Sequence, residues 1–123
     1  MNVAKFNPTG GPITATVASG FAQPGSYTLF LWEAHANKIV LSARGNFINS
    51  DDDTYKLPLP NPQNQDRIVE AIVTVAITLP IRNYDLRLTI HQDGGDIGEE
   101  TVTGQAKDPS VTADLFLRLE PAS

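Results

Sequence analysis

Cysteine is absent from the 123-residue chain, which excludes disulfide bonds, thiolate metal sites and a cysteine nucleophile. Clusters of basic residues are absent too. Nine lysines and arginines stand against 14 acidic residues, and the net charge is −5. Because binding to a phosphate backbone needs many cationic contacts, we expect neither nucleic acid nor an anionic membrane surface as a partner.

Long apolar segments are also missing. No run approaches the ~20 residues that span a bilayer, and the first residues lack the apolar core of a signal peptide. We therefore expect a soluble chain that is cytoplasmic by default. Its length fits one domain, residues 1–123. Residues 1–12 end in Pro8-Thr9-Gly10-Gly11-Pro12, a run of turn formers that predicts a loose lead-in.

The longest apolar run extends from Ile68 to Leu79 and is rich in β-branched residues, which suit a pleated strand. Read with a period of two, one face is wholly apolar and the other is mixed, as in a strand of an antiparallel sheet. Twelve residues would extend about 40 Å, roughly twice a typical strand. We expect this strand to bend, to bulge or to pass between two sheets.

Similar alternation recurs along the chain, without a helical period. Further strands are expected at residues 13–21, 27–34, 39–43, 55–59, 84–91, 97–103 and 111–119. Two of them, 55–59 with its proline and the acidic 97–103, suit sheet edges. The pattern predicts an all-β fold, an antiparallel two-sheet β-sandwich of about eight strands, with a β-barrel as the second architecture.

The segment Leu79-Pro80-Ile81-Arg82-Asn83-Tyr84-Asp85-Leu86 is loosely similar to the tyrosine corner of fibronectin-III and immunoglobulin-like sandwiches. This resemblance implies a general architecture of that type. It implies nothing about function, because unrelated functions share this architecture.

Two acidic turns, Asp51-Asp52-Asp53 and Asp93-Gly94-Gly95-Asp96, carry the oxygen ligands that calcium prefers. Neither matches an EF-hand loop, and acidic turns are common without an ion. We expect no metal or cofactor, and a calcium-dependent binding domain remains an alternative. His35 and His91 could titrate near neutrality, but no catalytic motif accompanies them. We predict that the chain is not an enzyme.

We therefore predict a binding module, and two kinds of partner are considered for it. A carbohydrate would bind polar loops at one end of the sandwich, where alternating chain reversals bring several turns together. The candidate ligand-binding residues are His35, Asn37, Asn64, Asp66, Asp93 and Asp96. Amide, imidazole and carboxylate groups suit a hydroxyl-rich ligand. Trp32 could stack on a sugar, but its central strand favours a place in the core.

A protein partner is the alternative. It would use an apolar outer sheet face, and a second copy of the chain would give a homo-oligomer. The residues expected on that face are Ile68, Ile72, Ala76 and Phe116.

Overall fold

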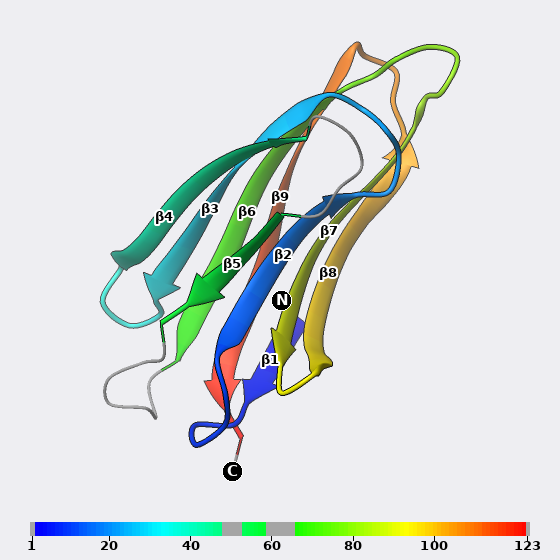
Figure 1. Cartoon of the computed structure of the whole chain (residues 1–123). Coiled ribbons are helices and arrows are strands. Elements are labelled where there is room, and N and C mark those ends of the chain that lie inside the picture. The colour runs from blue at the N-terminus through cyan, green and yellow to red at the C-terminus, as the bar shows by residue number, and fades with distance from the viewer. Residues whose placement is uncertain (1, 48–52, 59–65, 123) are drawn as a thin grey trace.

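Figure 1 shows the computed structural model of the chain, in which residues 2–47, 53–58 and 66–122 are described. These residues form nine strands. The strands are β1 (Asn2–Phe6), β2 (Ile13–Ser19), β3 (Gly25–Glu33), β4 (Lys38–Phe47), β5 (Asp53–Leu57), β6 (Arg67–Ala76), β7 (Asn83–Gln92), β8 (Gly95–Gln105) and β9 (Ser110–Pro121). Within the described ranges there is no helix, and so none that could cross a bilayer.

The strands form two sheets with the core between them. Sheet A has five strands in the order β1-β9-β6-β3-β4, and sheet B has four in the order β5-β2-β7-β8. All neighbours are antiparallel except β1 and β9. The sandwich prediction is therefore confirmed, with one strand more than expected. The strands β5 and β8 lie at edges of sheet B, as the proline and the acidic residues predict.

Alternating apolar residues from both sheets fill the core. Leu29 and Leu31 of β3 face inward from sheet A, and Leu86, Leu88 and Ile90 of β7 face inward from sheet B. All five side chains are fully buried. Burial of this surface is the main force that holds the two sheets together.

The long apolar run behaves differently from its prediction. The strand β6 ends at Ala76, and its pairing with β3 and β9 has no register shift. The expected bulge or change of sheet is therefore wrong. The surplus residues leave the sheet instead, because the Ile77 N–H donates to the Pro109 carbonyl and a turn follows. Leu79, expected to face inward, is 67% exposed.

The prediction of a loose lead-in is wrong for residues 2–6, which form β1. Its Ala4 and Phe6 are completely buried in the core, while the alternate residues Val3 and Lys5 face outward. The strand is short, and its partner β9 lies over a hundred residues away along the chain. A short strand with a distant partner cannot be recognised from its local sequence. The turn formers at residues 8–12 therefore led to the prediction of a loose segment.

The β3–β4 and β7–β8 turns lie at the same end of the sandwich, as the alternation of chain reversals predicts (Figure 1). Asn37 in the first turn and Asp93 and Gly94 in the second have positive φ angles of 49°, 52° and 79°. Asparagine, aspartate and glycine tolerate this conformation best. The strand β4 has a bulge at Val40, opposite the Leu31–Trp32 step of β3.

Candidate functional site

The outer face of sheet A carries aromatic side chains that the core does not use. Phe30 and Trp32 point outward from β3, because Leu29 and Leu31 face the core. Their ring centroids lie 5.8 Å apart with planes tilted by 47°. Both side chains are half-buried, so the placement of Trp32 in the core is wrong. The segment is bulky on both faces, and alternation alone does not say which face turns inward.

The strand register determines what surrounds these rings. Ile68 of β6 lies opposite Trp32, and Glu70 lies opposite Phe30 on one side and Phe116 on the other. The Trp32 indole Nε1 donates a hydrogen bond of 3.1 Å to Oε1 of Glu70. One carboxylate is thus surrounded by three aromatic rings, one of which it holds in place.

A hollow of about 290 Å³ opens beside this cluster, and we call it the Trp32 groove. The residues that line it are Trp32, Glu33, Ala34, Asn37, Ile68, Glu70 and Phe116. Its volume is near the lower end of the ~300–1,000 Å³ typical of small-molecule sites. Apolar rings and a few polar groups at the margin are the usual composition of such a site.

The environment of Glu70 disfavours its ionised form. Partial burial among the rings raises the pKa of the Glu70 carboxyl, and a hydrogen bond with Asp114 raises it further. The Trp32 N–H opposes this effect, because it donates to the carboxylate and lowers the pKa. Ionisation of Glu70 on this face is therefore costly for the fold.

We expect Glu70→Gln to stabilise the protein at neutral pH but not in acid. The folded state holds the Glu70 proton more tightly than the unfolded state does. Wild-type stability is therefore lost as the pH rises from the ordinary glutamate range through the raised pKa of the folded state. Glutamine carries no charge and can still accept the Trp32 hydrogen bond. Urea denaturation over a series of pH values measures the difference.

The control is Glu99→Gln, on an exposed carboxylate of β8. This variant should show no comparable pH-dependent gain. A constant difference between Glu70→Gln and the wild type at all pH values would contradict the assigned role of Glu70.

Three of the six residues predicted from the sequence lie around the Trp32 groove. Asn37 lines it directly. His35 and Asp66 line an adjoining hollow of about 60 Å³, which shares Glu33 with the groove. The sequence therefore predicted polar residues at the margin of the Trp32 groove, but not the aromatic residues at its centre.

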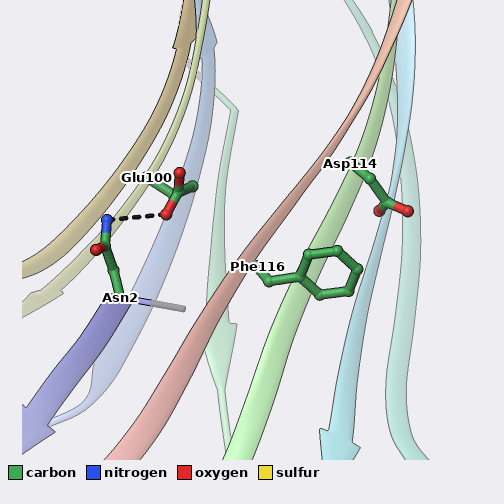
Figure 2. A pocket seen from close by; sticks show the side chains of 4 residues that line it. All are labelled: Asn2, Glu100, Asp114 and Phe116. Atoms are coloured by element: carbon green, nitrogen blue, oxygen red, sulfur yellow. Dashed lines mark hydrogen bonds between the residues drawn. The ribbon is translucent and has the colours of Figure 1, made fainter.

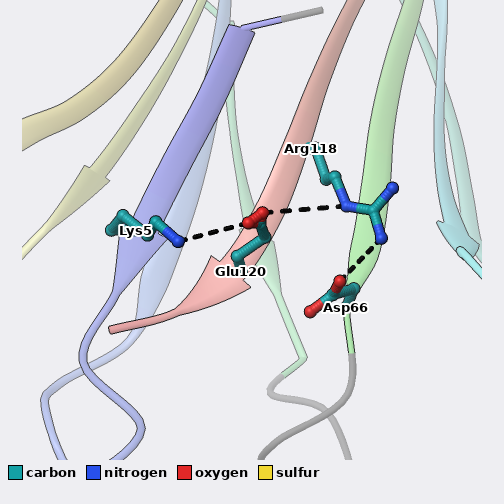
Figure 3. Close-up of polar contacts among 4 residues, drawn as sticks. All are labelled: Lys5, Asp66, Arg118 and Glu120. Atoms are coloured by element: carbon teal, nitrogen blue, oxygen red, sulfur yellow. Dashed lines mark hydrogen bonds and ion pairs between the residues drawn. The ribbon is translucent and has the colours of Figure 1, made fainter. Parts of the chain in front are cut away.

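Asp66 also has a structural role that limits its use as a ligand. Arg118 of β9 donates a hydrogen bond of 2.7 Å to the Asp66 carboxylate, and this contact raises the pKa of the Arg118 guanidinium. Figure 3 shows the chain of charges continuing through Glu120 to Lys5 on β1. These contacts fasten the start of β6 to β9 and β1.

The remaining predicted residues do not join the groove. Asp93 belongs to the β7–β8 turn of sheet B, where its carboxylate accepts the Gly11 N–H at 2.9 Å and so fastens the loop after β1. Asp96 pairs with His91 on the outer face of sheet B. Asn64 lies outside the described residues. The five described residues thus share one end of the sandwich but do not form one site.

Sequence reasoning missed Phe30, Trp32 and Glu70 as members of a surface. It grouped Ile68, Ile72 and Phe116 on an outer face, and the structure places these three around Glu70. The same period of two in β3 places Phe30 and Trp32 together on one face of the strand, which makes them candidates for an outward-facing surface. Their contact with β6 required the strand order, which alternation does not contain.

No group of three or more histidine, aspartate and glutamate side chains in the described ranges is arranged to hold a metal ion. Of the acidic turns considered for calcium, Asp51 and Asp52 lie outside those ranges. In the other turn, the Asp93 carboxylate binds the Gly11 N–H and the Asp96 carboxylate pairs with His91, so the two carboxylates have different partners. The described geometry therefore offers no argument for calcium.

No known protein family, curated protein or solved structure matches the chain. Relatives therefore give no guide to a ligand. The chemistry of the exposed faces is the basis for any statement about function.

Proposed function

We propose that the chain is a non-catalytic binding module that holds carbohydrate on the outer face of sheet A, in the Trp32 groove. One observation carries this proposal: the half-buried Trp32 ring is held by Glu70 beside a hollow that has polar groups at its margin. Sugars have apolar C–H faces that pack on aromatic rings and hydroxyls that donate to carboxylates and amides. The groove provides both kinds of group.

The arrangement suits binding rather than catalysis. Glu33 and Glu70 are the groove's carboxylates, and Glu70 is engaged by Trp32 and Asp114. A hydrolytic site would need an acid and a base placed on either side of one bond. Because Glu70 is already bonded to Trp32 and Asp114, we propose that it orients the groove rather than acting in hydrolysis.

The proposal predicts that Trp32→Ala abolishes most carbohydrate binding. A glycan array identifies a bound sugar, and titration calorimetry compares the variant with the wild type. Loss of a central tryptophan should cost about 2 kcal/mol, or roughly 30-fold in affinity. Thr89→Ala, on the outer face of sheet B, is the matched control and should bind as the wild type does. An array without any bound glycan would refute the proposal.

A protein partner is the second candidate, and a specific observation favours it. Ile39, Val3 and Ile72 on the same face are 44%, 42% and 36% exposed. The register places Ile39 beside Trp32 and Val3 beside Arg118, so apolar groups extend from β4 to β1. Exposed apolar side chains spread over one face are typical of an interface, and a second copy of the chain is the simplest occupant.

Sedimentation separates the two candidates. If a second copy covers the face, the wild type should sediment as a dimer at micromolar concentration, and Ile72→Lys should convert it to a folded monomer. A buried, unpaired lysine would cost several kcal/mol at such an interface. A wild-type monomer at all concentrations tested would exclude self-association.

A further inference from the structure

A second hollow lies next to the Trp32 groove, where the outer face of sheet A meets the open edge of β9. It measures about 410 Å³ and is lined by Asn2, Glu100, Asp114 and Phe116 (Figure 2). It exists because β1 covers only part of β9: the first residue of β1, Asn2, lies opposite Leu117. Within the described residues, no strand borders the preceding stretch of β9, residues 110–116, on this side.

The two hollows are neighbours. Phe116 lines both of them, and the register places Asp114 diagonally across from Glu70. A continuous path therefore leads from the β3–β4 turn, over β6 and past the Phe116 ring, to the edge beside Glu100 of β8. The path runs across the strands.

The length of this path exceeds one sugar ring. Going from β3 to β9 crosses two inter-strand spacings, about 10 Å, and the step to the position beside β9 adds about 5 Å more. A single sugar would occupy only the Trp32 groove. An oligosaccharide lying across the strands would reach both hollows and contact Phe116 between them.

The charges along the path restrict the type of sugar. Glu70, Asp114 and Glu100 border it, and none of these three forms an ion pair with a described residue. The Glu100 carboxylate accepts a hydrogen bond from the Asn2 amide, at 2.8 Å, and Glu70 is bonded to Trp32 and Asp114. An acidic glycan would meet uncompensated like charge here, which is strongly unfavourable.

We infer that the ligand is a glycan chain of several sugars without acidic groups, which spans both hollows across sheet A. This inference rests on the proposed function and adds the length, direction and charge of the ligand. The Trp32 groove holds one part of the chain. The hollow beside Asn2 holds the next, where the carboxylates of Asp114 and Glu100 accept its hydroxyl hydrogens.

Calorimetric titration with cello-oligosaccharides and chitin oligosaccharides tests the inference. In the series that binds, the hexasaccharide should bind at least tenfold more tightly than the disaccharide. Glu100→Gln should reduce this ratio several-fold, and Thr101→Ala, on the neighbouring residue of β8, should leave it unchanged. Thermal melting verifies that both variants fold. An oligogalacturonate of the same length should bind at least tenfold more weakly than the neutral hexasaccharide.

Each failure has a separate meaning. Equal affinity for the disaccharide and the hexasaccharide would overturn the inference and leave the proposed function intact. Equal affinity for the acidic and the neutral chain would overturn its charge requirement. If neither neutral series binds, the inference fails, and the glycan array decides separately whether the proposed carbohydrate function fails with it.

Discussion

Gly45→Val should destabilise the domain by about 3 kcal/mol, because a side chain at this position has no space. A Cβ atom on Gly45 would lie 2.1 Å from Oη and 2.3 Å from Cζ of Tyr27, its cross-strand partner. The Tyr27 ring cannot move aside easily. It packs on Phe47 at a centroid distance of 5.3 Å, and its hydroxyl bonds that of Tyr55 on β5.

This tyrosine pair connects the two sheets, since β3 belongs to sheet A and β5 to sheet B. Burial, followed by the hydrogen bond with Tyr55, raises the pKa of the Tyr27 hydroxyl, so Tyr27 stays un-ionised under ordinary conditions. Displacing Tyr27 would disturb packing inside sheet A and the contact with sheet B together. The effect should therefore exceed that of an ordinary edge-strand substitution.

Gly95→Val is the matched control for this experiment. A Cβ atom on Gly95 would meet no other atom within 4 Å, so the substitution adds the same side chain without a clash. Urea denaturation of both variants measures the difference in the free energy of unfolding. If Gly45→Val loses no more stability than Gly95→Val, the packing of Tyr27 over Gly45 is not a constraint on the fold.

Leu88→Ala is expected to cost about 3 kcal/mol of the free energy of unfolding, as is typical for buried leucine. Leu88 is completely buried on the central strand β7, between Val17 of β2 and Glu100 of β8 in the register. The neighbouring strand β2 is also held by its pairing with β5, so the cavity should collapse only partly. A domain of this size is stable by roughly 5–15 kcal/mol, so the loss would be a large fraction.

Ile81→Ala provides the comparison, since Ile81 is 48% exposed in the turn before β7. It should change stability by less than about 0.5 kcal/mol. Chemical denaturation with a constant m-value would show that both measurements report the same transition. A loss at Leu88 as small as that at Ile81 would contradict the assigned core.

Local patterns predicted much of this architecture. The alternation in residues 84–91 and 111–119 identified β7 and β9, and Asp93-Gly94 identified the turn between β7 and β8 because its backbone needs positive φ. Prolines and acidic residues identified the two edge strands of sheet B, β5 and β8. Each of these signals lies within a few residues of the feature that it predicts.

Features that depend on distant partners were not predictable in this way. The strand β1 is short and becomes recognisable only through its pairing with β9. Trp32 appeared to be a core residue because Leu31 and Trp32 are both large, and the choice of inward face depends on how β3 packs against sheet B. The candidate site has the same limitation: Phe30, Glu70 and Phe116 meet through the order of three strands.

The pairing of β1 with β9 also affects how the protein folds as it is made. The two strands lie at opposite ends of the sequence, yet Ala4 and Phe6 of β1 complete the core beside β9. At a synthesis rate of roughly 5–20 residues per second, β1 leaves the ribosome several seconds before its partner exists. During that time its apolar residues have no sheet to join. Closing this long loop should make docking of β1 a late step and give slow folding overall.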